Sequence, residues 1–155
     1  MKFSTKEDID APIDAVFDML CEFDQFERAA MRRGAEVQRV DRLAEAGPGM
    51  QWEAAFDMRG KRRELQVEMD RFDRPTEMKL NTRSQGLTGD RSFDLGALSR
   101  SRTRIMVALE LKPQNLSARL LVQSLKLAKN SLTKKFKKRV GDYAKDMEDR
   151  YHKPR

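Results

Sequence analysis

The sequence contains very few residues of the types that most often carry catalytic or metal chemistry. Its 155 residues include one cysteine, one histidine and one tryptophan. Because Cys21 has no second cysteine to pair with, an intramolecular disulfide is excluded. His152 sits in a basic tail with no pattern around it that would orient it, so we expect no histidine-dependent nucleophile or general base. With one thiol and one imidazole, and with acidic residues that do not recur at calcium-loop spacing, we expect no metal site and no cofactor.

Long apolar runs are also missing. No stretch approaches the roughly 20 apolar residues of a membrane-spanning helix. Residues 1–10 lack the apolar centre of a signal peptide. The glycines of Gly47-Pro48-Gly49 precede a predicted strand and not a helix, so they form a turn and not a phosphate-binding loop. We therefore expect one domain, residues 1–155, located in the cytoplasm.

Basic residues are concentrated near the end of the chain. Residues 1–115 contain 20 Lys+Arg and 21 Asp+Glu, whereas residues 116–155 contain 12 and 4. The simpler interpretation of this segment is a solvated helix face, and the alternative is a surface for anionic lipid or nucleic acid. Aromatic residues are not interleaved with the basic ones, as binding of single-stranded nucleic acid would require. The basic surface positions are Arg119, Lys126, Lys134 and Lys137.

Hydrophobic periodicity predicts the order of the elements. Residues 2–10 alternate with a period of two and predict a strand, and helical spacing then predicts a helix over residues 13–22. A second short helix is predicted to be capped by Asp24 and ended by Gly34. Between residues 35 and 112 the period returns to two, with turn residues at regular intervals, which predicts six further strands. The first of these six, the second strand of the chain, is marked by Val37, Val40 and Leu43. Residues 116–140 predict one long amphipathic helix. The expected fold class is α+β: a seven-stranded antiparallel sheet curled around a long C-terminal helix, with two short helices after the first strand.

In this order of elements the chain resembles the SRPBCC superfamily, which includes START lipid-transfer domains, birch-pollen-allergen-like proteins and polyketide cyclase/dehydrases. The resemblance covers nearly the whole chain. It is carried by Ile9-Asp10-Ala11-Pro12 with Val16-Phe17 behind it, by Phe23-Asp24-Gln25-Phe26, by the Gly47/Gly49 turn before Trp52, and by the closing helix. It implies a helix-grip fold whose cavity, between sheet and helix, receives a lipid, sterol, quinone or polyketide-like molecule.

Residues on the predicted inward rows are the candidates for lining such a cavity. Several are methionines, whose flexible side chains suit either an adaptable pocket or an ordinary filled core, and the sequence leaves both open. The candidates are Glu7, Trp52, Phe56, Met58, Met69, Met78, Leu80, Thr82, Arg91 and Phe93 from the strands, and Leu121, Leu125, Leu132, Phe136 and Tyr143 from the long helix.

Three polar candidates, Glu7, Arg91 and Tyr143, are the residues on which an enzymatic function would depend. An inward Glu7 or Arg91 would need a partner, because unpaired charges are costly to bury. They would then form a mutual pair or await a polar ligand group, unless their rows reach the rim and leave them in water. No catalytic set is identified, so the first hypothesis is a carrier of a hydrophobic small molecule. The alternative is a cyclase or dehydrase in which Glu7, Arg91 or Tyr143 performs acid/base work. The oligomeric state stays open.

Overall fold

The protein forms one curved antiparallel sheet with helices on its inner side and at its end. The structure, a computed structural model, describes residues 1–153. The strand order is β1-β7-β6-β5-β4-β3-β2, so each strand pairs with its successor except that β1 closes against β7. The strands are β1 (Lys2–Ile9), β2 (Glu36–Arg39), β3 (Gln51–Met58), β4 (Lys61–Asp73), β5 (Glu77–Ser84), β6 (Leu87–Ala97) and β7 (Thr103–Pro113), and the helices are α1 (Ile13–Leu20), α2 (Phe23–Arg32), α3 (Leu116–Leu127) and α4 (Lys129–His152).

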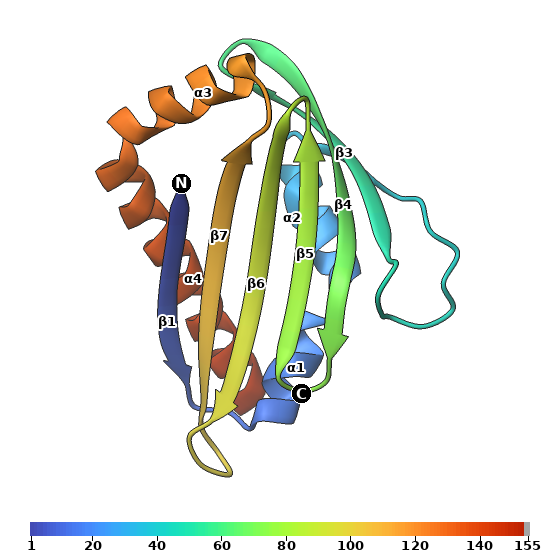
Figure 1. The fold of residues 1–155 in the computed structure, drawn as a ribbon. Coiled ribbons are helices and arrows are strands. Elements are labelled where there is room, and N and C mark those ends of the chain that lie inside the picture. Colours follow the sequence, from blue (N-terminus) through green and yellow to red (C-terminus); the bar gives the residue numbers. More distant parts are fainter. Residues whose placement is uncertain (154–155) are drawn as a thin grey trace.

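This arrangement confirms the predicted α+β helix-grip fold, including its seven antiparallel strands and the two short helices after the first strand. Figure 1 shows α1 at one end of the sheet, α3 at the opposite end, and α4 descending alongside β1. The alternating apolar residues of β3 to β7 and β1 thus share one face, and the helices cover that face.

The hydrophobic core fills the end of the sheet that faces α1 and the second half of α4. Register brings Ile105 of β7 opposite Leu95 of β6, and α4 contributes Met147, which is fully buried. Burial of these side chains is the main favourable term in folding. The core comprises Ile9, Ala11, Val16, Phe17, Leu20, Met50, Trp52, Met69, Met78, Leu95, Ile105, Val107, Ala144 and Met147.

The predicted single helix over residues 116–140 is two helices. α3 ends at Leu127, and the backbone at Ala128 leaves helical geometry, with φ −105° and ψ 18°. The following Lys129-Asn130-Ser131 contains residues whose side chains favour caps and turns over helix interiors. The break lets α3 cross the end of the sheet while α4 packs along β1 (Figure 1).

The second predicted strand is also shorter than its apolar pattern suggested. β2 ends at Arg39, and the Asp41 side chain accepts hydrogen bonds from the Arg39 side chain and from the backbone N–H groups of Leu43 and Gln51. A side chain that bonds the local backbone in this way competes with strand pairing. Val40 and Leu43, expected inside the strand, lie exposed beyond its end.

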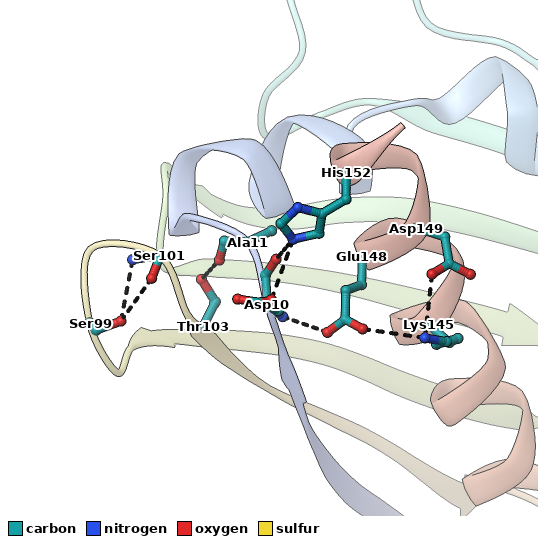
Figure 2. Close-up of polar contacts among 9 residues, drawn as sticks. All are labelled: Asp10, Ala11, Ser99, Ser101, Thr103, Lys145, Glu148, Asp149 and His152. Carbon is teal, nitrogen blue, oxygen red and sulfur yellow. Dashed lines mark hydrogen bonds and ion pairs between the residues drawn. The ribbon is translucent and has the colours of Figure 1, made fainter. Parts of the chain in front are cut away.

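The last turns of α4 are attached to the connection between β1 and α1. The Asp10 backbone N–H donates to Glu148 at 2.7 Å, and His152 Nε2 lies 2.5 Å from the Asp10 carbonyl oxygen. Figure 2 shows these contacts between the end of α4 and the β1–α1 connection. Next to them, the buried Thr103 hydroxyl donates to the Ala11 carbonyl at 2.8 Å. The sequence showed nothing that would orient His152; the fold supplies Asp10, which is distant in sequence.

Candidate functional site: a cavity beneath α3

A cavity of about 510 Å³ lies between α3 and the end of the sheet that the core leaves unfilled. The inner rows of β3 to β7 form its floor, and α3 forms its roof. Gly89, on the inner row of β6, contributes no side chain to this floor, and its neighbour across the strands is the short Thr82. The apolar lining consists of Phe56, Met58, Leu65, Val67, Leu80, Leu87, Leu109, Leu111, Ala118, Leu121 and Leu125.

The polar lining of the cavity is basic. Lys61 and Arg63 of β4 and Arg91 of β6 face it, together with neutral side chains such as Thr82 and Ser84. Within residues 1–153, no aspartate or glutamate belongs to the lining. The cavity is therefore an apolar chamber with a positive electrostatic potential.

Arg91 lies near the middle of the inner face of the sheet. Its register partners are Leu80 on β5 and Leu109 on β7, so its immediate cross-strand neighbours are both apolar. Loss of solvation lowers the pKa of its guanidinium, and the charge of Arg139 on α4 lowers it further. The side chain is nevertheless exposed to solvent, which reaches it through the cavity. In the described part of the chain it makes no hydrogen bond or ion pair with protein.

Arg63 is the second unusual cation. It occupies the inner row of β4 in phase with Leu65 and Val67, and its Nε is buried without a hydrogen-bond partner among residues 1–153. A buried N–H without an acceptor costs free energy relative to its hydrated state. Two arginines of one cavity thus have hydrogen-bonding capacity that the described protein atoms leave unused.

Seven of the fifteen residues expected to line a cavity do so, namely Phe56, Met58, Leu80, Thr82, Arg91, Leu121 and Leu125. Most of the others pack in the filled part of the core. Met69 and Met78 are fully buried, and Phe136 stacks on Phe3 with ring centroids 5.8 Å apart. Trp52 packs against Phe23, and Leu132 and Phe93 are partly buried outside the cavity lining. The sheet's inward rows were thus predicted, but the sequence did not show which part of each row is filled.

The remaining two predicted polar residues are far from the cavity. The Tyr143 hydroxyl donates to the Met19 carbonyl at 3.4 Å, and burial raises the pKa of this phenol. Glu7 lies against Gly141 of α4, and register aligns it with Leu95 of β6, four residues along that strand from Arg91. No ion pair joins Glu7 and Arg91 within the described chain, so the two do not form the mutual pair considered from the sequence.

Several lining residues were not singled out from the sequence, and Arg63 is the most consequential. A signal for it was present: Arg63 shares the period-two row of Leu65, Val67 and Met69, just as Arg91 shares the row of Phe93 and Leu95. The apolar residues Leu109 and Leu111 lay in a predicted strand but were not assigned to a cavity.

The basic positions on the helices face solvent. Arg119 and Lys126 on α3, and Lys134 and Lys137 on α4, are all exposed. Three leucines of α3 are exposed beside them: Leu116, Leu120 and Leu127 have 72%, 58% and 91% of their surface accessible. The outer side of α3 is therefore both basic and apolar.

A larger depression of about 800 Å³ lies on the other face of the sheet. Its lining includes Glu53, Arg62, Glu64 and Arg83, which alternate with the inward residues of β3, β4 and β5. It is wide, open and polar, whereas the cavity beneath α3 is less open and is lined mainly by apolar side chains.

Two further features are absent from residues 1–153. No group of three or more His, Cys, Asp and Glu side chains is arranged to hold a metal ion. No helix in this range is long and apolar enough to cross a membrane.

Comparison with known proteins gives matches in structure but not in sequence. No family model and no curated protein matches the sequence. The structure is similar to the Zhui aromatase/cyclase of Streptomyces sp. R1128, at 14% identity and a TM-score of 0.66 over 97% of this chain and 95% of that one. It is also similar to a Thalictrum flavum norcoclaurine synthase (10% identity, TM-score 0.68, 99% and 96% covered) and to a START superfamily protein of Mycobacterium smegmatis (12%, 0.55, 86% and 95%). The SRPBCC-type fold inferred from the sequence is thereby confirmed.

Proposed function

We propose that this protein binds a small hydrophobic molecule in the cavity beneath α3. The observation that carries the proposal is the cavity itself, about 510 Å³ in volume and walled mainly by aliphatic side chains. Ligand sites are typically concave, largely apolar and of roughly 300–1,000 Å³. The fold neighbours add support, since an aromatase/cyclase, a norcoclaurine synthase and a START protein share this architecture.

Binding without chemistry accounts for the site better than a cyclase or dehydrase reaction. General acid/base catalysis requires the acid or base to reach the reacting atoms. Of the three residues considered for that work, only Arg91 faces the cavity; Tyr143 and Glu7 lie elsewhere. A guanidinium stays protonated at neutral pH and serves to hold an anion, not to transfer a proton.

The test uses N-phenyl-1-naphthylamine, a neutral apolar dye whose fluorescence rises on transfer out of water. Leu125→Trp places an indole in the cavity and should weaken dye binding by about tenfold, because the dye and the indole compete for one volume. Leu127→Trp is the matched control, since Leu127 is on the same helix but almost fully exposed. Equal binding by both variants, or no dye binding by the unaltered protein, would contradict the proposal.

A second candidate function is contact between α3 and an anionic lipid surface. It is favoured by Leu116, Leu120 and Leu127, which are exposed among basic residues, and by the absence of any acidic residue between positions 116 and 141. An amphipathic surface of this kind binds anionic interfaces through apolar insertion and charge attraction together.

Vesicle sedimentation tests this second candidate. Vesicles with 30% phosphatidylserine should bind the protein at low salt, and pure phosphatidylcholine vesicles should not. Replacing Leu127 by Ser should weaken binding, and neutralising Lys126, Lys134 and Lys137 should abolish it. Salt-independent binding, or binding only to RNA in a parallel assay, would argue against the membrane assignment.

A further inference from the structure

The charges that face the cavity are all of one sign. Lys61, Arg63 and Arg91 belong to its lining, and no carboxylate within residues 1–153 does. A purely apolar ligand would displace the water that reaches Arg91 through the cavity, and removing a cation from water is costly unless an anion compensates it. The cations are therefore the feature of the cavity that a purely hydrophobic ligand does not explain.

The acidic residues nearest in sequence to Arg91 do not supply that anion. Asp90 and Asp94 precede and follow it at odd spacing on β6, so both point to the opposite face of the sheet. Asp90 accepts a hydrogen bond from Asn81 and pairs with Lys112 on that outer face. Glu7, the inward carboxylate of β1, lies over Gly141.

Arg63 on β4 likewise has no carboxylate beside it on the inner face of the sheet. Its flanking residues Arg62 and Glu64 belong to the outer row, where Arg62 pairs with Glu36. The buried Nε of Arg63 has no acceptor among the described residues, although nearly all buried N–H groups in native proteins are paired. Arg63 and Arg91 thus line the same cavity, and neither has a carboxylate partner among residues 1–153.

We propose that the ligand of this cavity is an amphipathic acid, whose carboxylate or phosphate monoester group is bound by Arg91, with Arg63 adding a second positive charge. The apolar part of the ligand then lies against Leu80, Leu109 and Leu121. Guanidinium groups suit this task because their donors match the two oxygens of a carboxylate or phosphate. This inference rests on the proposed function and specifies its ligand class.

The experiment compares three probes with the same chain: dodecanoate, dodecyl phosphate and dodecan-1-ol, measured by displacement of N-phenyl-1-naphthylamine. The two acids should bind about tenfold more tightly than the alcohol, because a hydrogen bond to a charged group is worth more than a neutral one. Acetate and inorganic phosphate should not displace the dye, since they lack the chain that the apolar walls hold. Displacement by these small anions at the same concentrations as dodecanoate would overturn the assignment.

Substitutions test which residues cause the preference for acids over the alcohol. Arg91→Gln should abolish the tenfold difference between dodecanoate and dodecan-1-ol. Arg91→Lys should retain part of the difference, and Arg63→Gln should reduce it. Arg119→Gln is the matched control, because Arg119 is exposed on the outer side of α3 and should leave the difference intact.

The outcomes separate the two proposals. If the dye and all three probes bind but the acids have no advantage, the headgroup assignment is wrong and the hydrophobic cavity stands. If neither the dye nor any probe binds to the unaltered protein, the proposed function itself fails. An acid preference that survives in Arg91→Gln would overturn the role of Arg91. The comparison among probes needs no variant, so it remains decisive even if Arg91→Gln does not fold.

Discussion

Gly86 and Asn115 are in direct contact, and this contact ties the β5–β6 turn to the first turn of α3. A Cβ atom placed on Gly86 would lie 2.0 Å from Asn115 Nδ2, and the backbone at Gly86 has φ +83°. The Asn115 side chain meanwhile accepts a hydrogen bond from the Ala118 N–H at 2.8 Å, which caps α3. The helix that roofs the cavity therefore begins against a turn that only glycine fits.

Gly86→Ala should lower the free energy of unfolding by about 2 kcal/mol, combining backbone strain at positive φ with the loss of the helix cap. Urea denaturation measures this change. Gly96→Ala is the control, because a Cβ at Gly96 meets nothing within 4 Å and its φ is not positive. In an Asn115→Ala background, Gly86→Ala should cost about half as much, since the cap is already absent. An equal cost of Gly86→Ala in both backgrounds would show that the substitution does not act through the Asn115 cap.

Gly141 of α4 makes room for the inward carboxylate of Glu7. A Cβ at Gly141 would lie 2.8 Å from Glu7 Oε1, the mobile end of that side chain. Gly141→Ala should therefore change stability little in the unaltered protein, because the gain in helix propensity, about 1 kcal/mol, is offset by displacing the carboxylate. In a Glu7→Ala background the same substitution should stabilise by about 1 kcal/mol. Thermal denaturation of the unaltered protein, the two single variants and the double variant measures both effects. If Gly141→Ala changes stability equally with and without Glu7, the Glu7 carboxylate does not interact with position 141.

The sheet was predictable because its signal is local. Period-two alternation with turn residues between strands gave all seven strands, and the inward rows followed from the same alternation. β2 was overestimated because the apolar residues Val40 and Leu43 continued the pattern, whereas the bonds made by Asp41 end the pairing. Side-chain bonds of this type leave no trace in hydrophobic periodicity.

The break between α3 and α4 was not predicted, and it decides where the cavity lies. Residues 116–140 are a nearly continuous helical pattern without glycine or proline, so no strong breaker marks Ala128. Asn130 and Ser131 favour helix ends only weakly, and the break accompanies a change of packing partner: α4 follows β1 while α3 crosses the far end of the sheet. This tertiary effect explains why Leu121 and Leu125 line the cavity while Leu132 and Phe136, on the same predicted stripe, do not.

Tyr143 makes stability depend on alkaline pH. Burial raises its pKa above the ordinary value near 10, so the folded protein holds the phenolic proton over a range in which the unfolded chain releases it. Its contribution to stability is complete below the unfolded pKa and is lost as the pH rises toward the folded pKa. Urea midpoints measured between pH 9 and 11 should fall, and Tyr143→Phe should flatten that decline. A decline of the same slope in Tyr143→Phe would assign the effect to other groups.

Arg91 should lower the stability of the ligand-free protein, because its guanidinium sits among apolar neighbours without a protein anion. Arg91→Met keeps an unbranched side chain about as long as the aliphatic part of arginine and removes the charge. It should therefore raise the free energy of unfolding by about 1 kcal/mol, a modest value because the cavity admits water to the side chain. Arg104→Met is the control, for which the opposite effect is expected. Arg104 makes two hydrogen bonds with Asp8, at 2.8 and 3.2 Å, and their loss should destabilise the protein slightly.

Saturating dodecanoate should make the unaltered protein more stable than Arg91→Met. A ligand stabilises the folded state in proportion to its affinity, and only the unaltered protein has Arg91 to bind the carboxylate. A less stable ligand-free Arg91→Met would show that Arg91 has a structural partner and serves the fold.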